Sequence, residues 1–411
     1  MSMDAGRIAG TARIVVIGSG HSAGRLIGQL KSLGHRGQMV LVGEEAHPPY
    51  ERPWLSKSML TEPVEPALPS ILPDLEGVEF RPLRQAVAID RNAGRVRLED
   101  GSDEAYDILV LATGLAPRRL ALFDGMEDRV LCLHKLDEAR ALRARLRQET
   151  GAGSVALIGA GFIGLEVASS ARQLGCAVDI IEKAPLPLMR ALPEALGRQI
   201  ATLHEAEGSR LHLGTGVADV AAEGDGVRLS LENGSHISAK TVVLGMGGTP
   251  RDTLAREAGL DLADGILTDA AGRSSDPQIF AIGDVARQRS GTAEMAGIRL
   301  ESWRNAEDSA IAAAAAILDA PPPPPPGAPS FWTEQLGQRI QFIGQPVADG
   351  ELWQSGEAFR PGYGAFLMRD DCLHQAVFVN APKVMRAARE AFRRDGRIAA
   401  DTLSALGFRR I

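Results

Sequence analysis

The sequence has few cysteines, few aromatic residues and no surplus of positive charge. Its three cysteines are Cys132, Cys176 and Cys372, and none lies in the C-x-x-C spacing of a metal site or a redox dithiol. We therefore expect three idle or buried thiols and no metal site. The formal net charge of −7 argues against a general nucleic-acid binder, which usually carries a basic surplus.

Long apolar runs and an N-terminal targeting pattern are missing too. No apolar stretch is long enough to span a bilayer, so no membrane association is expected. Residues 1–13 lack the apolar core of a secretion signal, and a cytoplasmic location is the resulting expectation. A chain of 411 residues is too long for one hydrophobic core, which predicts two or three domains.

One pattern is present twice. In each copy an apolar run leads into a glycine turn, then a helical stretch, then a second apolar run that ends in an acidic residue. The first copy covers residues 12–44 and the second covers residues 154–182. This order predicts two β-α-β units.

The two glycine turns predict two dinucleotide sites. A pyrophosphate needs donors at close range, and the first turn of a helix supplies free N–H groups and a partial positive charge. Small residues must keep this backbone open and let the helix approach the strand. They are Gly18, Gly20 and Ala23 in the first copy, and Gly159, Gly161 and Gly164 in the second.

An acidic residue ends the second strand of each copy, Glu44 in the first and Glu182 in the second. A carboxylate at this place accepts hydrogen bonds from the ribose hydroxyls of an adenosine. It also repels a 2′-phosphate, so Glu182 predicts a preference for NADH over NADPH. The adjacent Lys183 could weaken that preference.

Further elements follow the two units. Residues 87–90, 95–99, 108–114, 227–231, 241–247 and 278–284 have the composition of strands, and residues 305–319 that of a helix. Six consecutive prolines at 321–326 favour an extended, stiff connector. Residues 329–411 then form a small domain, with strands near 339–343, 364–368 and 375–379 and a helix from about Lys383.

Five short motifs resemble those of the FAD-dependent ferredoxin reductases that serve Rieske-type aromatic-ring dioxygenases and heme monooxygenases. The motifs are ERPWLSK at 51–57, YDILVLATG at 106–114, FAIGDVA at 280–286, ESWRNA at 301–306 and FWTEQ at 331–335. The matches run in order from residue 14 to about residue 383.

The resemblance implies an α/β fold with two Rossmann-like dinucleotide-binding domains, on a glutathione-reductase-like plan, and a small α+β C-terminal domain. FAD is expected at the first turn and NAD(H) at the second. The predicted FAD-binding domain is discontinuous, at 1–118 and 248–320. The NAD(H)-binding domain covers 119–247, a proline-rich linker covers 321–328, and the C-terminal domain covers 329–411.

The family's binding residues carry over to matching positions. The FAD set is Gly18, Gly20, His21, Ser22, Ala23, Glu44, Arg52, Lys57, Val87, Ala112, Thr113, Gly114, His134, Gly283, Asp284, Trp303, Ala306 and Trp332. The NAD(H) set is Gly159, Gly161, Phe162, Ile163, Gly164, Glu166, Glu182, Lys183 and Gly247. The predicted catalytic residues are Lys57, near the flavin, and Glu166, near the nicotinamide. His134 replaces an arginine that contacts FAD phosphate in the family, which leaves this contact to His134 or to Lys135.

The cysteine positions also bear on the electron acceptor. Disulfide reductases of similar fold need a C-x-x-x-x-C pair near the flavin, and related peroxidases and oxidases need one cysteine soon after the first unit. No cysteine precedes Cys132. An external one-electron acceptor remains, a 2Fe-2S ferredoxin or a rubredoxin. A second class is a flavoprotein whose NADH binding serves signalling, as in apoptosis-inducing-factor-like proteins.

Docking of an acidic ferredoxin requires local positive charge. Lys383, Arg386, Arg389, Arg393 and Arg394 lie near helical spacing and could form such a patch, or could be an ordinary solvated helix face. The protein is expected to be a monomer or a weak homodimer.

Overall fold

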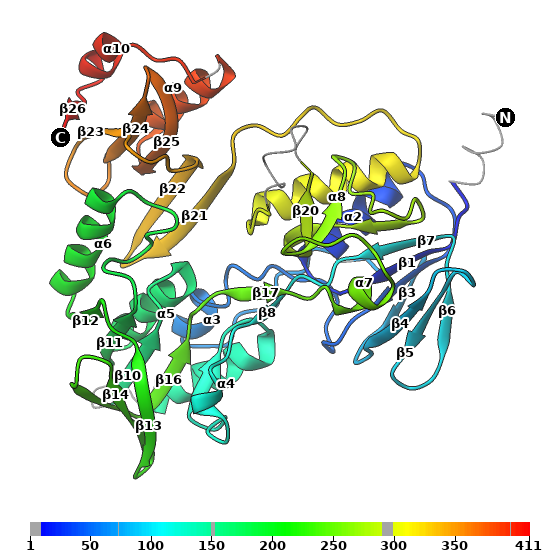
Figure 1. Cartoon of the computed structure of the whole chain (residues 1–411), viewed down its shortest axis with the longest axis horizontal. Helices are drawn as coiled ribbons and strands as arrows, with labels where there is room; N and C mark the ends of the chain where they lie inside the picture. Colours follow the sequence, from blue (N-terminus) through cyan, green and yellow to red (C-terminus); the bar gives the residue numbers. More distant parts are fainter. Residues whose placement is uncertain (1–9, 73, 149–152, 290–298, 395) are drawn as a thin grey trace. The chain divides into compact units, whose positions relative to one another are not determined.

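The computed structural model describes residues 10–72, 74–148, 153–289, 299–394 and 396–411 (Figure 1). Most of the N-terminal stretch predicted to lack a secretion signal therefore lies outside the described residues. The chain forms two compact units. The first comprises Met1–Arg52, Ala67–Ala116 and Gly248–Pro326, and the second comprises Pro53–Pro66, Pro117–Gly247 and Gly327–Ile411. The finer division into FAD-binding, NAD(H)-binding and C-terminal domains stays a prediction.

A parallel sheet of five strands forms the centre of the first unit. Its order is β19-β7-β1-β2-β3, with β1 Ile14–Ile17, β2 Met39–Val42, β3 Val78–Arg81, β7 Ile108–Leu111 and β19 Ile279–Ala281. These strands are short, nearly continuous apolar runs because both faces of a parallel sheet are covered.

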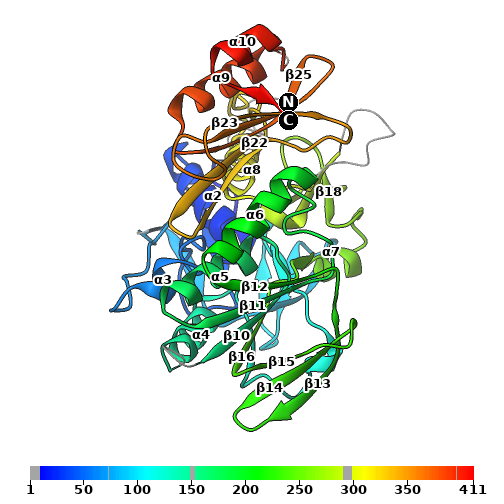
Figure 2. The ribbon, with the colours of Figure 1, turned by 90° about the vertical axis from the view of Figure 1, so that its left-hand side faces the viewer.

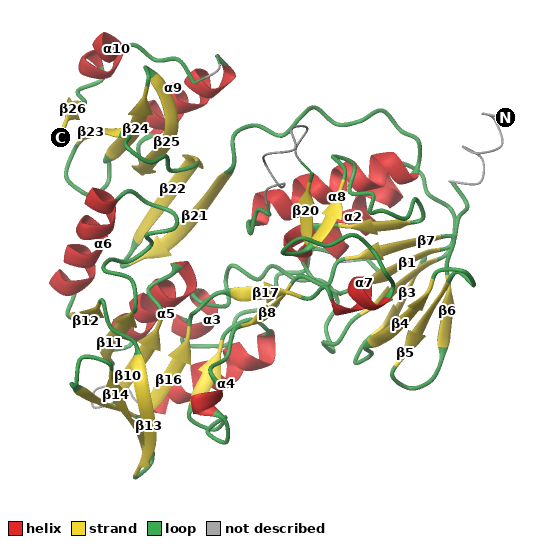
Figure 3. Cartoon of the chain, viewed as in Figure 1, coloured by secondary structure: helices red, strands yellow, loops and turns green. Residues whose placement is uncertain are grey.

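The two faces of this sheet are covered differently. Ile14 and Val16 pack into a core with the helices α2 (His21–Ser32) and α8 (Trp303–Ile317), which lie side by side (Figure 3). Val15 and Ile17, which alternate with them, pack into a second core. That core includes residues of the antiparallel sheet β4 (Ala86–Asp90), β5 (Arg95–Leu98) and β6 (Asp103–Ala105). The smaller elements include α7 (Thr253–Glu257), β18 (Ile266–Thr268), η2 (Gly283–Val285) and β20 (Ala286–Gln288).

The second unit repeats the parallel plan. Its sheet has the order β12-β11-β10-β16-β9, with β9 Val130–Cys132, β10 Ser154–Ile158, β11 Ala177–Glu182, β12 Ser209–Leu213 and β16 Thr241–Leu244. Helix α5 (Phe162–Gln173) packs on β10 and β11, and α6 (Glu194–Ala206) packs on β12. Three antiparallel strands, β13 (Val217–Glu223), β14 (Gly226–Leu231) and β15 (His236–Ala239), form a separate sheet (Figure 2). Helices α3 (Ser58–Thr61) and α4 (Leu136–Gln148) pack against each other.

The C-terminal part of the second unit is an antiparallel sheet of order β21-β22-β25-β24-β23-β26. Its strands are β21 Ser330–Gln335, β22 Gln338–Gly344, β23 Glu351–Ser355, β24 Gly364–Arg369, β25 Cys372–Val379 and β26 Arg409–Arg410. Helix α9 (Pro382–Arg393) buries Val384, Ala388 and Ala391, and it packs on β25. The short helix α10 (Ala400–Ala405) follows.

The predicted fold class is confirmed, including both β-α-β units and the α+β segment at the C-terminus. The run predicted as a strand at 278–284 is shorter in the structure, because the chain turns into η2 at Gly283. The prolines at 321–326 lie in neither a helix nor a strand. In the parts of the chain that the structure describes, no helix is both long and apolar enough to cross a membrane.

Two candidate dinucleotide sites and a buried lysine–glutamate pair

The first glycine turn joins β1 to α2. Gly18 has φ +105°, and a Cβ on it would lie 2.2 Å from the carbonyl oxygen of Ala112, so this position requires glycine. Gly20 is the N-cap of α2 with extended torsions. Among the described residues no side chain caps the helix. Its first N–H groups therefore remain as donors for an anion.

His21 starts α2 and lies against Trp303, with 5.0 Å between ring centroids. Its side chain is only 9% exposed, yet neither ring nitrogen has a hydrogen-bond partner among the described residues. Burial lowers the pKa of His21 to about 4, with Arg25 and Arg52 acting in the same direction. A neutral, unsatisfied imidazole beside the glycine turn fits a bound ligand with polar oxygens.

Ion pairs and hydrogen bonds surround this histidine. The indole Nε1 of Trp303 donates to Glu51 at 2.7 Å, and Arg52 pairs with Glu45 at 2.6 Å. These contacts hold Trp303 and Arg52, both predicted site residues, in defined orientations.

Another glycine of the first unit lies close to the start of α2. Gly283 has φ +70°, and a Cβ on it would lie 2.7 Å from Oγ of Ser22. The next residue, Asp284, is partly buried, and this desolvation, assisted by Glu301, raises its pKa to about 7. Ala306, on α8, is buried. The structure thus brings Ser22 and Gly283 together, as predicted for one site.

Glu44, at the end of β2, is bound to a residue that the sequence did not single out. Arg251 pairs with Glu44 at 2.7 Å. The backbone of Arg251 is fixed in turn, since its carbonyl accepts from Oγ1 of Thr113 at 2.7 Å and its N–H donates to Gly114 at 3.0 Å. Val87 lies at a β-bulge in β4, where the ladder register shifts.

The second glycine turn joins β10 to α5 with the same backbone. Gly159 has φ +106°, and a Cβ on it would lie 2.6 Å from the carbonyl oxygen of Gly245. A Cβ on Gly164 would lie 2.1 Å from the carbonyl oxygen of Gly159, so the helix sits too close to the turn for any larger residue. Gly161 is the N-cap of α5, with extended torsions. The next residues are apolar, Phe162 and the exposed Ile163.

Glu182 holds the second turn directly. Its carboxylate oxygens accept from the backbone N–H groups of Ala160, within the turn, and of Ala184, each at 2.7 Å. Lys183 points elsewhere and pairs with Glu232 at 3.1 Å. Gly247, with φ +78°, follows β16.

The two predicted catalytic residues lie together in the second unit. Nζ of Lys57 donates to Oε2 of Glu166 at 2.7 Å, and both side chains are largely buried. Oγ of Ser56 donates to the same oxygen at 2.5 Å. Nζ of Lys57 also donates to the carbonyl of Pro53 at 2.8 Å. Such a pair holds an ammonium group at a fixed place.

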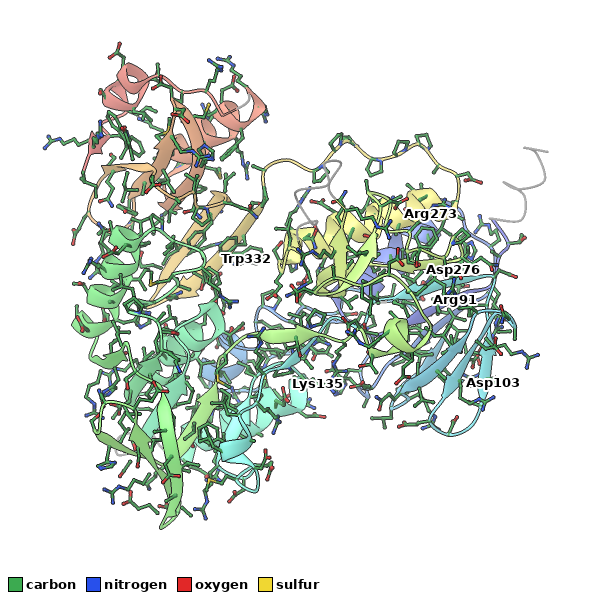
Figure 4. All side chains as sticks on the ribbon, in the orientation of Figure 1. Arg91, Asp103, Lys135, Arg273, Asp276 and Trp332 are labelled. Carbon is green, nitrogen blue, oxygen red and sulfur yellow. The ribbon has the colours of Figure 1, made fainter. Side chains whose placement is uncertain are left out.

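Trp332, His134 and Lys135 also belong to the second unit. Trp332 lies on β21, with the Arg339 guanidinium 5.1 Å from its ring centroid (Figure 4). The backbone N–H groups of His134 and Lys135 donate to Glu138 at 2.7 and 3.0 Å, at the start of α4. Their proposed contact with FAD phosphate stays a prediction.

Several residues that contact the predicted ones are not in the predicted set. They include Arg251 and Glu51, although Glu51 begins one of the quoted motifs. Thr333 and Gln335 lie in another quoted motif, and both turn out to be buried and polar. The available signal for these two is strand alternation, because Thr333 and Gln335 lie two positions apart in β21 and therefore face the same side of the strand.

Two glycine turns of this form, each at the start of a helix, define a class of protein: oxidoreductases that bind two dinucleotides. Both turns pass the same test, because each would be blocked by a Cβ and each leaves helix N–H groups open. Residues 12–310 match the family model described as pyridine nucleotide-disulphide oxidoreductase, and residues 330–408 match the one described as reductase C-terminal. The chain belongs to the pyridine nucleotide-disulphide oxidoreductase family. It is an oxidoreductase that uses FAD and a nicotinamide dinucleotide.

Three solved structures are similar over nearly the whole chain. Putidaredoxin reductase, in a covalent complex with putidaredoxin, is 28% identical with a TM-score of 0.88, over 95% of each chain. The ferredoxin reductase for the CYP199A2 system of Rhodopseudomonas palustris is 31% identical with a TM-score of 0.88, over 96% of this chain and 98% of that one. Fdr9 is 33% identical with a TM-score of 0.84, over 95% and 97%. The resemblance to ferredoxin reductases of oxygenase systems is confirmed.

Proposed function

We propose that this protein is an NADH:ferredoxin reductase that passes electrons through FAD to a 2Fe-2S ferredoxin, which feeds a Rieske-type dioxygenase or a heme monooxygenase. The observation that carries the proposal is the pair of matching glycine turns in one chain. Similarity to ferredoxin reductases supports the choice of acceptor. FAD supplies the chemistry, since it takes a hydride from a nicotinamide and can release electrons singly.

In this proposal the first turn holds FAD. The N–H groups at the start of α2 bind the pyrophosphate, and the unsatisfied ring nitrogens of His21 add a contact there. Glu44 accepts hydrogen bonds from the adenosine ribose. Its carboxylate then either binds the ribose and Arg251 together or gives up the ion pair with Arg251. Asp284 accepts from a ribityl hydroxyl, and Trp303 lies beside the flavin ring.

The second turn holds NADH in this proposal. The apolar start of α5, with Ile163 exposed, offers a surface for the nicotinamide ring. Glu182 is fixed by two backbone N–H groups, so its charge stays beside the turn and opposes a 2′-phosphate. Lys183 is engaged with Glu232, which supports the preference for NADH.

Lys57 and Glu166 are proposed to act at the flavin. The ammonium group of Lys57 would favour the anionic reduced ring, because a nearby positive charge stabilises it. Glu166 holds that ammonium group in place. In these roles both residues act by holding groups in place, so positioning of the reacting groups is the main contribution of the protein.

The electron acceptor is proposed to dock on α9. Lys383, Arg386, Arg389 and Arg393 are all exposed on this helix. Arg393 and Arg394 share one carboxylate, that of Glu390, at 3.6 and 2.8 Å. The helix surface therefore carries a surplus of positive charge, which suits an acidic ferredoxin.

The test is steady-state NADH oxidation with purified ferredoxins and rubredoxins, comparing wild type with the double variant Arg386→Glu, Arg393→Glu. We expect the double variant to have a higher KM for ferredoxin, and the increase should be larger at low salt, where charges are less screened. Ferricyanide reduction should be unchanged. Arg228→Glu, an exposed site on β14, is the matched control and should leave KM unchanged. Turnover with rubredoxin alone, or no turnover with either, would contradict the proposal.

A further inference from the structure

A chain of hydrogen bonds runs inward from the lysine–glutamate pair. Oε1 of Glu166, the oxygen not used by Lys57, accepts from Oγ1 of Thr333 at 2.7 Å. Oγ1 of Thr333 accepts from Nε2 of Gln335 at 3.1 Å. Oε1 of Gln335 lies 3.0 Å from Nε2 of His204. The chain therefore connects Lys57 with His204 through three intervening side chains.

All members beyond Lys57 are buried. Thr333, Gln335 and His204 have no exposed surface, and Glu166 is 4% exposed. They come from three separate elements of the second unit, α5, β21 and α6. Buried polar groups need hydrogen-bond partners, and each side chain in this series of hydrogen bonds provides one for the next.

The direction of every bond is determined. The Glu166 carboxylate accepts, so the Thr333 hydroxyl must donate to it. The Gln335 amide donates to Thr333 with its nitrogen, so its oxygen faces His204. Burial lowers the pKa of His204, which favours the neutral ring. An amide oxygen can only accept, so this ring carries its proton on Nε2, and Nδ1 has no partner among the described residues.

This order makes each member set the next one's orientation. His204 Nε2–H fixes which end of the Gln335 amide faces Thr333. The Gln335 N–H occupies a lone pair of the Thr333 hydroxyl and turns its proton towards Glu166. With Thr333 and the N–H of Glu334, which donates at 3.1 Å, one carboxylate oxygen is fully held, and the other is left for Ser56 and Lys57.

We propose that Thr333, Gln335 and His204 are positioning residues that orient Glu166 and, through it, the ammonium group of Lys57. The inference rests on the proposed function, in which Lys57 acts at the flavin. It adds that the buried hydrogen bonds that begin at His204 on α6 determine the position of the Lys57 ammonium group.

The test is anaerobic stopped-flow reduction of the FAD-loaded protein by NADH, with variants of Thr333. Thr333→Val removes the hydroxyl at nearly constant volume, and we expect the limiting rate of flavin reduction to fall about tenfold. The apparent Kd for NADH should stay within about twofold, because no NADH contact is removed. Thr333→Ser keeps the hydroxyl and should restore most of the rate.

A matched control is Thr241→Val, since Thr241 is equally buried and its hydroxyl has no partner among the described residues. It should leave the rate unchanged. If Thr333→Val fails to fold, the pair His204→Leu and His204→Gln decides, because only glutamine keeps a donor towards Gln335. We expect a slower rate for leucine than for glutamine.

Equal rates for wild type, Thr333→Val and His204→Leu would overturn the inference, as would an equal loss in Thr241→Val. These outcomes differ from failure of the proposed function. If NADH does not reduce the wild-type flavin at all, the proposed function is wrong, and the positioning role that rests on it is wrong as well. If wild type is reduced rapidly and the variants match it, only the positioning role is wrong.

Discussion

The two glycine turns share a backbone but differ in their surroundings. Gly18 and Gly159 have φ angles of +105° and +106°, and Gly20 and Gly161 cap their helices with nearly the same extended torsions. Charged and aromatic side chains surround the start of α2, whereas apolar side chains follow the second turn. The same local sequence pattern thus produces the same backbone geometry in two different side-chain environments.

The acidic residues show the difference most clearly. Glu44 pairs with the distant Arg251, and both side chains are about one-third exposed. Glu182 instead accepts from the backbone of its own turn, through Ala160. The first acid is held by a partly exposed ion pair, and the second accepts hydrogen bonds from the turn itself.

The largest expected effect separates the two turns. Gly18→Val should abolish FAD binding, and Gly159→Val should abolish reduction by NADH while FAD stays bound. Each change combines a positive φ with a Cβ that would clash with a carbonyl oxygen, at 2.2 and 2.6 Å. Strain and overpacking each cost about 1–3 kcal/mol. Flavin content and the rate of flavin bleaching by NADH are the measurements.

Gly28→Ala is the control for this pair. A Cβ on Gly28 would meet nothing within 4 Å, and alanine in a helix is favoured over glycine. Both activities should survive. Loss of FAD in the Gly159→Val protein would show that the two turns are not separate sites.

The fold and the turns were predictable because their signals are local. Strand, glycine turn, helix and acidic strand end follow one another within about 30 residues, and both copies form as expected. The helix from Lys383 was predicted on its spacing and begins at Pro382.

The side-chain partners were not predictable because they come from distant segments. Arg251 and Glu44 are 207 positions apart, and no pattern in either segment predicts a contact with the other. The same holds for Thr333 and Glu166, which are separated by 167 positions. Local periodicity fixes an element and its faces, but long-range pairing depends on how sheets and helices pack.

His21 and Phe162 occupy the same position after the two turns, so His21→Phe sharpens the comparison. In wild type the pKa of His21 is lowered to about 4, so protonation opposes folding of the FAD-free protein. The part of the unfolding free energy that depends on a neutral His21 is present above pH 6.5 and is lost as the pH falls towards 4. This loss amounts to about 3 kcal/mol in all. We expect His21→Phe to flatten urea-unfolding stability over this range.

The variant should also bind FAD more weakly, because the imidazole no longer offers a polar contact. An unchanged pH profile of stability would show that His21 is not buried as a neutral ring. The affinity is measured by flavin fluorescence on reconstitution.

The two acids should differ in their effect on stability. Glu182→Ala leaves two backbone N–H groups without their acceptor and should cost about 1–3 kcal/mol of unfolding free energy. Glu44→Ala removes a partly exposed ion pair and should cost about 0–1 kcal/mol. Urea unfolding of the two variants measures both. Equal costs would mean that Glu182 does not hold its turn.

A further expected effect concerns nucleotide choice. Glu182→Gln keeps an oxygen acceptor for the turn but removes the negative charge that opposes a 2′-phosphate. We expect the ratio of kcat/KM for NADH over NADPH to fall about tenfold, close to 1.4 kcal/mol. A wild type that already favours NADPH would contradict the assignment.

The most direct test of two separate dinucleotide sites is an anaerobic titration of the purified yellow protein with NADH, followed by flavin absorbance. We expect full bleaching by one equivalent of NADH per bound FAD, and no bleaching in the flavin-loaded Gly159→Val variant. A colourless protein that takes up no flavin, or a variant that bleaches as fast as wild type, would contradict it.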